Sequence, residues 1–405
     1  MGEHIPLKIH EVPTGTFASD WKVPPEWNVF DAFIEDADGS RVIDINQHNL
    51  HLVGYSIPVN KKMSLEELQP HLHSLPEQPD AIPYRTSYYE ENWGFCLSHN
   101  HRKNLKKDTY RVVIESELKN GFLTYGELII PGTSGKEVFI STYVCHPSMV
   151  NNELSGPVIT TKIAEWLSTV PRRYTYRIVF VPETIGAILY MSKNLDQVKG
   201  KTIAGFNLSC LGDERCYSFV QSRYGNTLTD RIAAKQLRKR KLAGENTVTY
   251  TYLDRQSDER QYCSPGVDLP LVTLCRSRFG MYPEYHTSLD NFSLVTTKGI
   301  YGGFTYVKNC LEDVENSLLY TATNCGEPQL GRRGLYPQQG SRGSGAEPGS
   351  EVIMKNLNVR SVLDVLAYCD GTNAVEDLSD RLNITTHEVQ KIVTILVDEG
   401  LIELS

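Results

Sequence analysis

Short apolar runs alternate with helical repeats along residues 131–312. Five of these runs have the length and the β-branched or aromatic content of buried strands. Between and after them, apolar residues recur at the three- and four-residue spacing of a helix. The expected strands are 137–144, 176–182, 202–209, 216–222 and 269–275, and the expected helices are 157–169, 185–195, 226–238 and 296–315. This alternation predicts an α/β fold, a doubly wound and mainly parallel sheet with helices on both faces.

Residues 45–130 have a different pattern. Apolar and polar positions alternate in HLVGYSIPVN, YRVVIESEL and GFLTYGELII, which is the two-residue period of a half-buried strand. One stretch, MSLEELQPHLHSL, has the spacing of a short amphipathic helix. We therefore expect a β-rich inserted domain over 45–130, flanked by two parts of the α/β domain, 1–44 and 131–325.

The C-terminal part differs in composition. Glycine, proline and serine dominate the second half of 326–351, which predicts a linker. Residues 352–405 then show three helical patterns and a final strand. Thr385 or Thr386 is suited to cap the third helix, and Gly400 is suited to end it. This order of elements predicts a winged-helix domain.

Composition narrows the class of protein. Hydrophobic residues make up 40% of the 405 residues, which suits a globular chain with a sizeable core. The net charge of −8 argues against a surface made for nucleic acid. No apolar run reaches the length of a membrane span, and MGEHIPLKIH lacks the features of a signal peptide. The nine cysteines form no CxxC pair and predict reduced core thiols, so we expect a cytoplasmic protein.

Candidate chemistry gathers at the ends of the predicted strands. His146 follows the strand 137–144, and Glu183 follows the strand 176–182. His286 lies in the turn-like stretch PEYHTSLDN. Open α/β sheets bind ligands at the carboxyl ends of their strands, so these three side chains are candidates for one site.

His99 and His101 form a weaker metal candidate. They lie two residues apart, which on a strand places both side chains on one face. No carboxylate stands at ligand spacing nearby, so ordinary polar loop histidines are the better interpretation. The aromatic stretch around them is also suited to form the wall of a pocket.

Four motifs together resemble a known family. STYVCHPSMVNNELSGP, FVPETIG, SDERQYCSPG and PEYHTSLDN are similar to those of a bacterial family with a zinc-aminopeptidase-like domain, a β-rich insert and a C-terminal winged helix. The wider relatives of that family are the co-catalytic zinc aminopeptidases and the glutamate carboxypeptidases. The resemblance covers nearly the whole chain and implies a doubly wound sheet with a metal site.

The resemblance carries over only residue by residue. His146 and His286 match the two histidine ligands of the wider family, and Glu183 matches its general base. Other residues stand where that family has carboxylates: Ser148, Asn152, Thr184 and Ser209. Two closely spaced cations without a bridging carboxylate repel by about 4 kcal/mol at 4 Å, even at a dielectric near 20. We therefore expect one zinc ion, completed by Asn152, Glu153 or Asp213.

The implied activity is amide or peptide hydrolysis on a small or modified peptide-like substrate. The resemblance places Asp258, Arg260 and Tyr285 around the cleft. An aspartate there would bind a free amino group and an arginine a carboxylate, although a salt bridge between the two is an equal alternative. Two other functions stay open: zinc-dependent acyl or aminoacyl transfer or cyclisation, and a degenerate peptidase fold that acts as a binding module.

The winged helix lacks the charge for DNA. Its predicted third helix, THEVQKIVTILVDEGL, has Lys391 as its one lysine or arginine. DNA affinity depends on several such contacts to phosphate. We expect a protein-facing role instead, toward the hydrolase domain, a second copy of the chain or a peptide, with a structural lid as the alternative.

Overall fold

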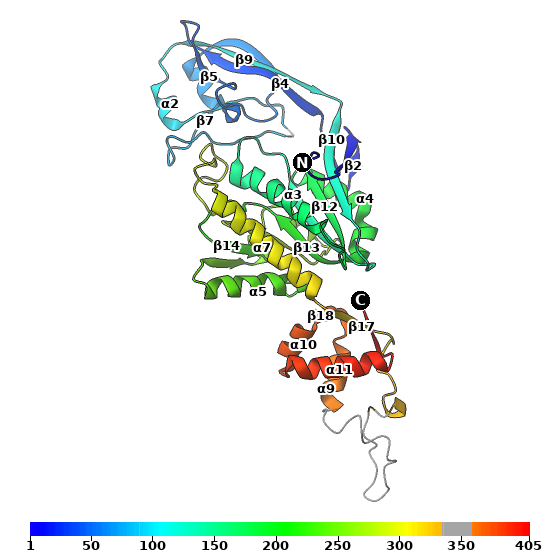
Figure 1. Ribbon diagram of the computed structural model, residues 1–405. Helices are drawn as coiled ribbons and strands as arrows, with labels where there is room; N and C mark the ends of the chain where they lie inside the picture. The colour runs from blue at the N-terminus through cyan, green and yellow to red at the C-terminus, as the bar shows by residue number, and fades with distance from the viewer. Residues whose placement is uncertain (89, 334, 336–358) are drawn as a thin grey trace, which may run out of the picture. The chain divides into compact units, whose positions relative to one another are not determined.

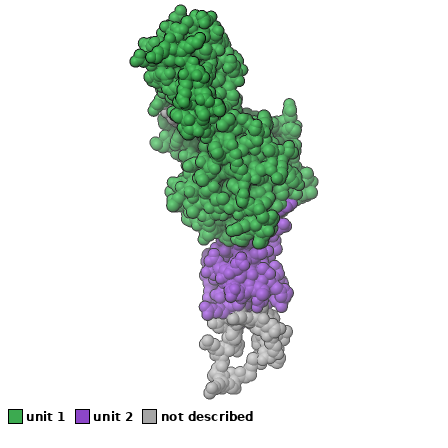
Figure 2. Space-filling view, turned by 90° about the vertical axis from the view of Figure 1, so that its left-hand side faces the viewer, with its two compact units in different colours: residues 1–311 green, residues 312–405 purple. Residues whose placement is uncertain are grey.

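The computed structural model describes residues 1–88, 90–333, 335 and 359–405 (Figure 1). Two compact units divide the chain, residues 1–311 and 312–405 (Figure 2). Most of the predicted linker, namely 334 and 336–351, lies outside the described residues. No helix of the described part has the length and apolar content needed to cross a bilayer.

An eight-stranded sheet forms the middle of the first unit, in the order β1-β10-β12-β11-β13-β16-β14-β15. The pairs β12–β11, β11–β13, β13–β16 and β14–β15 are parallel, and the other three are antiparallel. The predicted mainly parallel sheet is therefore present. Its strands are β1 (Lys8–Pro13), β10 (Phe122–Ile130), β11 (Glu137–Tyr143), β12 (Thr175–Val181), β13 (Thr202–Leu208), β14 (Tyr217–Val220), β15 (Thr247–Tyr250) and β16 (Leu271–Cys275).

Helices cover both faces of this sheet. Phe139 and Val179 pack in one core cluster with Tyr190 of α4. Thr142 points to the opposite face of β11 and contacts α3 at Gly156. A Cβ at Gly156 would clash with the Thr142 side chain and would lie 2.6 Å from the Leu208 carbonyl oxygen. Only glycine permits that close approach. The helices are α3 (Ser155–Leu167), α4 (Ile185–Lys201), α5 (Leu228–Leu242), α6 (Glu259–Tyr262) and α7 (Thr297–Asn316).

A second, antiparallel sheet belongs to the same unit and has the order β5-β4-β9-β6. Strand β4 comes from 1–44, whereas β10, from the predicted insert, joins the large sheet. The sheet to which each of these two strands belongs is set by pairing with strands that are distant in sequence. The strands of the antiparallel sheet are β4 (Glu26–Glu35), β5 (Arg41–Asp44), β6 (Val59–Ser64) and β9 (Thr109–Lys119). Two further pairs of short strands are β2 (Phe17–Ala18) with β3 (Trp21–Lys22), and β7 (Leu72–His73) with β8 (Phe95–Cys96).

Local structure in this region differs from the expected pattern. His99 and His101 lie on the helix α2 (His99–Asn104), which Ser98 caps through the His101 backbone N–H. Residues two apart on a helix do not share a face, so the alternative in which both side chains lie on one face of a strand does not apply. The alternating stretch 51–60 is strand only from Val59, where β6 begins, and before it lie the 3₁₀ turn Asn49–His51 and isolated bridges at Leu52 and Gly54. The amphipathic stretch forms the single turn α1 (Leu65–Leu68).

The second unit has winged-helix elements. Its sheet, in the order β18-β17-β19, consists of β18 (Asp370–Ala374), β17 (Leu319–Ala322) and β19 (Ile402–Leu404). Strand β17 precedes the predicted linker, so this unit includes residues that the sequence placed in the α/β domain. Thr385 and Glu388 form a capping box, and Gly400 has a φ of 66° after the last helix. The helices are α9 (Val359–Ala367), α10 (Val375–Leu382) and α11 (Thr386–Asp398).

Candidate metal and catalytic site

His146 lies just beyond the end of β11, and a carboxylate fixes its ring. The Nδ1 of His146 is 3.2 Å from Oε2 of Glu153. The other oxygen of Glu153 accepts the backbone N–H of Cys145 at 2.6 Å. A carboxylate accepts the imidazole N–H here, which leaves Nε2 of His146 free to bind a ligand. That Nε2 is 3.5 Å from Oε2 of Glu183.

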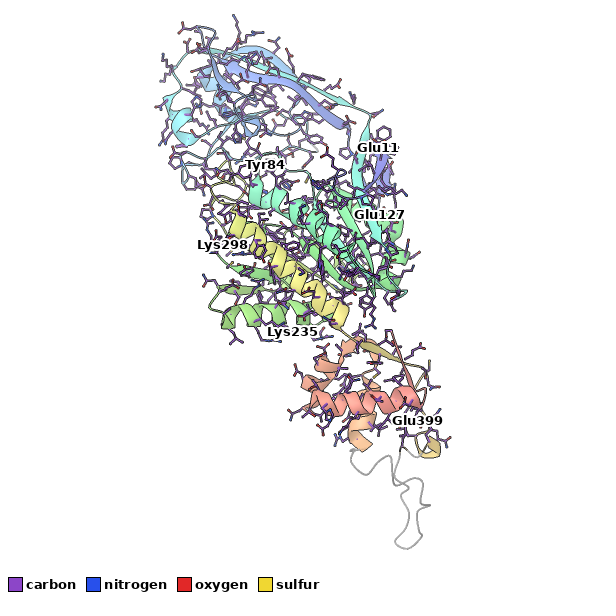
Figure 3. All side chains as sticks on the ribbon, viewed as in Figure 1. Glu11, Tyr84, Glu127, Lys235, Lys298 and Glu399 are labelled. Carbon is purple, nitrogen blue, oxygen red and sulfur yellow. The ribbon has the colours of Figure 1, made fainter. Side chains whose placement is uncertain are left out.

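His286 faces His146 across the site. Their ring centroids are 5.4 Å apart. The backbone N–H of Tyr84 donates to the His286 carbonyl at 2.8 Å, and Pro83 forms a bridge with Thr287. Figure 3 labels Tyr84 between the inserted strands and the large sheet. The insert thus holds the loop that carries His286, and the Tyr84 ring lies 5.3 Å from His146 and 5.1 Å from His286.

The Nε2 atom of His286 is buried and has no hydrogen-bond partner among the described residues. Burial, with a smaller effect of nearby His146, lowers the pKa of His286 to about 3. A neutral imidazole with an unsatisfied ring nitrogen is an available donor for a metal.

Glu183 begins a strained turn. Thr184 has φ 65° and ψ −77°, and the Ile185 N–H donates to the Glu183 carbonyl at 2.8 Å. This is a γ-turn with positive φ, a rare conformation for a β-branched residue. The Thr184 N–H donates to Oδ1 of Asp258 at 2.7 Å, and Ser257 Oγ donates to Oε1 of Glu183 at 2.8 Å. Burial raises the pKa of the Glu183 carboxyl, although His146 opposes the shift.

Asp258 and its neighbours hold this turn. Asp258 is fully buried, and its Oδ2 has no hydrogen-bond partner in the described part of the chain. Burial, with the neighbouring Glu183, raises the pKa of the Asp258 carboxyl well above its usual range. Arg260 donates to Oγ1 of Thr184 at 3.1 Å. Tyr285 stacks on His286 with centroids 3.9 Å apart.

Two of the residues expected to complete a metal site have other partners. Oδ1 of Asn152 accepts the Tyr143 hydroxyl at 2.7 Å, and the same hydroxyl lies 2.6 Å from Ser209 Oγ. Both oxygens of the fully buried Asp213 accept hydrogen bonds, including 2.7 Å and 2.9 Å from the side chain and backbone of Ser277. These interactions direct the polar atoms of Asn152 and Asp213 into structural networks.

Sequence reasoning missed several side chains of the site. Tyr143 was counted only as part of an apolar strand, and Ser257 only as part of a motif. Asp290 was also missed, although it accepts the backbone N–H groups of Asn151 and Asn152 at 2.6 Å and 2.9 Å. The motif that contains His286 also contains Asp290, so the signal was present in PEYHTSLDN.

A cavity of about 570 Å³ opens onto the site. His146, Glu183 and His286 all line it, as does Tyr84. Residues of both the insert and the large sheet form its walls. The remaining site candidates lie outside its lining: Asn152, Glu153, Asp213, Asp258, Arg260 and Tyr285.

The donor set fits one zinc ion. The Nε2 of His146 and the unsatisfied Nε2 of His286 are available as two imidazole ligands, and Oε2 of Glu183 lies 3.5 Å from the first of them, beside the place that such an ion would take. Cys145, His146 and Glu153 also lie close enough for a common ion. In that group, however, both Glu153 oxygens already have partners in Cys145 N–H and His146 Nδ1.

Comparisons with known proteins identify the family of the chain. Residues 1–317 match the family described as Domain of unknown function (DUF4910), and residues 318–404 match a winged helix-turn-helix family. A Clostridium acetobutylicum protein, provisionally named as a polysaccharide biosynthesis protein with an aminopeptidase-like domain, is 39% identical over 99% of this chain and 89% of its own length.

Solved structures show the same fold. A crystal structure of a Clostridium acetobutylicum protein, provisionally called a peptidase, has a TM-score of 0.78 at 37% identity and covers 100% of this chain and 89% of that one. A zinc aminopeptidase from Bacillus subtilis has a TM-score of 0.54 at 10% identity, over 76% of this chain and 84% of its own. The chain therefore belongs to the DUF4910 family, with an aminopeptidase-like α/β fold, a β-rich insert and a C-terminal winged helix.

Proposed function

We propose that the first unit is a metal-dependent amide hydrolase of the aminopeptidase type, with one zinc ion held by His146 and His286. One observation carries the proposal. The Nε2 of His146 lies 3.5 Å from Oε2 of Glu183, and the unsatisfied Nε2 of His286 lines the same cavity. Two imidazoles and a carboxylate on one cavity wall are the parts that hydrolysis of an amide requires.

Glu183 is the proposed general base. Ser257 holds its Oε1, while Oε2 remains directed toward His146. This free oxygen accepts the proton of the attacking water and returns it to the leaving amine. A zinc ion, when bound, lowers the pKa of water and polarises the substrate carbonyl. Glu153 keeps the His146 ring oriented throughout.

A single ion is the better fit. The Tyr143 hydroxyl lies between Asn152 and Ser209, two positions at which the wider family has carboxylates. The neutral amide of Asn152 and the hydroxyls of Tyr143 and Ser209, which already form hydrogen bonds with one another, are poor ligands for a second zinc ion. The name of the Clostridium acetobutylicum relative places that protein in polysaccharide biosynthesis, and we propose that this chain acts on a small or modified peptide-like amide.

Zinc content and turnover test the proposal together. We expect about one zinc ion per chain after purification, and its loss in His146→Ala and in His286→Ala. His99→Ala is the matched control, because His99 lies on α2 and is absent from the cavity lining. If both site variants keep the zinc content of the unchanged protein, the proposed ligands are wrong. If zinc is bound and no peptide amide is cleaved, the hydrolase activity is wrong.

For the winged helix we propose a protein-facing role. Residues 359–405 contain nine acidic residues and three lysines or arginines. This surplus of negative charge repels the phosphates of nucleic acid and suits a protein or peptide partner.

A further inference from the structure

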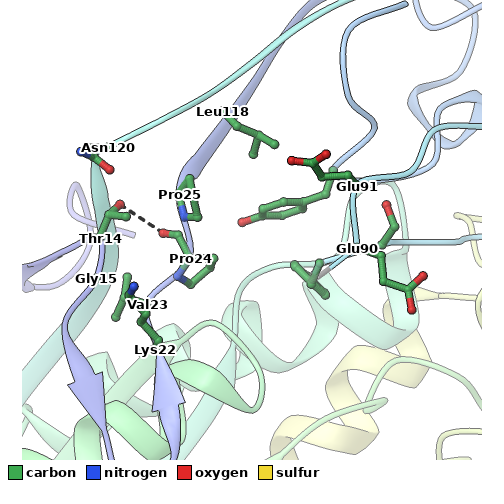
Figure 4. A pocket seen from close by; sticks show the side chains of 13 residues that line it. Thr14, Gly15, Lys22, Val23, Pro24, Pro25, Glu90, Glu91, Leu118 and Asn120 are labelled. Carbon is green, nitrogen blue, oxygen red and sulfur yellow. Dashed lines mark hydrogen bonds between the residues drawn. The ribbon is translucent and has the colours of Figure 1, made fainter.

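A second cavity, of about 500 Å³, adjoins the cavity at His146. Both linings include Pro24, Pro25, Tyr55 and Tyr88, so one wall serves both. Figure 4 shows the side chains that line this second cavity. Each cavity alone has a volume typical of a small-ligand site. Together they form a cleft that is longer than the space a single bound amino acid would occupy.

Aromatic rings form the shared wall. Tyr55 packs between Trp27 and Tyr88, with ring centroids 5.7 Å and 4.7 Å away. Tyr55 has a φ of 65°, which is unusual for a bulky residue. The next carbonyl, that of Ser56, accepts Trp27 Nε1 at 3.0 Å and Ser116 Oγ at 2.7 Å, and these bonds fix the turn. Tyr88 stays 42% exposed beside it. The Tyr55 ring on this fixed turn and the exposed Tyr88 ring beside it offer aromatic faces that suit the packing of a substrate ring.

The charges of the cleft are mainly negative. Glu26 and Glu183 line the cavity at His146, and among its described lining residues there is no lysine or arginine. The second cavity adds Glu90 and Glu91 against Lys22 alone. Carboxylates and electron-rich ring faces attract cations and repel anions.

We infer that the two cavities bind one elongated substrate: an amide that is uncharged or cationic and carries a ring several bonds away from the amide. This inference rests on the proposed function for the position of the amide near His146 and Glu183. The distant ring packs on Tyr55 and Tyr88, and the carboxylates of the second cavity disfavour acidic groups at that end.

Binding of peptide amides to the full, metal-free chain tests the inference separately from turnover. The probes are alanyl-alanine amide, the same peptide extended by tyrosine at either end, and the tyrosine-extended peptide with a further lysine or glutamate. Calorimetry should give a Kd at least tenfold lower for one tyrosine-extended peptide than for the short one. The lysine form should bind at least fivefold more tightly than the glutamate form at low salt.

Tyr88→Ala should reduce the tenfold gain to threefold or less, while Phe30→Ala should preserve it. Phe30 is a suitable control because it is 69% exposed and lies in neither lining. Glu91→Lys should reverse the preference between lysine and glutamate. Equal affinity for short and extended peptides overturns the inference, even where these amides are cleaved. Tight binding of the extended peptides to the metal-free chain, together with no cleavage of them by the zinc-loaded chain, would support the cleft and reject the hydrolase.

Discussion

The backbone N–H of Thr184 donates a hydrogen bond of 2.7 Å to Oδ1 of the fully buried Asp258. This bond holds Thr184 at a φ of 65°, directly after the proposed base Glu183. A backbone in such a sparsely populated region costs on the order of 1–3 kcal/mol and persists only when neighbours enforce it. We therefore propose that Asp258 positions Glu183, although the sequence had suggested binding of a substrate amine.

Removal of the hydrogen bond between Asp258 and Thr184 should impair turnover. Asp258→Ala should lower kcat by roughly 10- to 100-fold, because small displacements of a catalytic group cost that much. Thr184→Gly in the same chain should restore part of the loss, since glycine adopts positive φ without strain. Asp258→Asn keeps an oxygen acceptor and should keep most of kcat with an unchanged KM. A large rise of KM in Asp258→Asn, specific for substrates with a free amine, would support amine binding instead.

The Glu183→Gln variant distinguishes a role of Glu183 as general base from a role as metal ligand. Glutamine has nearly the same shape but cannot accept the proton, so turnover should fall by at least 10²-fold while zinc content is retained. Zinc analysis and peptide-amide assays on the same sample give both values. Joint loss of zinc and activity would identify Glu183 as a metal ligand, and full activity would exclude both roles.

Acid should destabilise the metal-free protein through His286. Its pKa is lowered from 6.5 to about 3 in the folded state, so the unfolded chain binds more protons between these values. The stabilising contribution is complete above pH 6.5 and is lost as the pH falls toward 3. One such group gives a slope approaching about 1.36 kcal/mol per pH unit. Denaturant titrations of the metal-free chain and of His286→Ala should therefore show a smaller pH dependence in the variant. Identical slopes would contradict this assignment.

Tyr143→Phe should destabilise the fold without releasing zinc. The change leaves the buried Oδ1 of Asn152 with only the weak Cys210 thiol donor at 3.7 Å, and it removes the 2.6 Å contact with Ser209. An unsatisfied buried polar group costs about 1–3 kcal/mol. Urea unfolding measures the loss of stability. Loss of zinc in a variant that remains folded would show that this network lies closer to the metal than proposed.

Residues 352–405 should fail to bind mixed-sequence duplex DNA. Nonspecific affinity requires several cationic contacts, and residues 359–405 offer three lysines or arginines among nine acidic residues. Fluorescence anisotropy at low salt measures this directly. Micromolar binding that weakens with added salt would overturn the protein-facing role.

Sequence patterns located the chemistry well where the signal is local. Apolar runs and helical spacing depend on neighbouring residues, so the strands before His146 and Glu183 and the helices after them were predictable. The segment of His99 and His101 forms a helix where a loop was expected, because a short segment between polar residues has too little periodicity to separate loop, strand and helix. The Ser98 cap decided that case.

The set of elements, the family resemblance and the site candidates His146, Glu183 and His286 were therefore accessible from the order of residues alone. Tertiary structure decided which atoms are available. It turned Glu153 from a candidate ligand into the partner of His146 Nδ1, occupied Asn152 with a tyrosine hydroxyl, and placed the insert against His286 through Tyr84. Each of these depends on contacts between residues distant in sequence or on side-chain direction, which no one-dimensional pattern encodes.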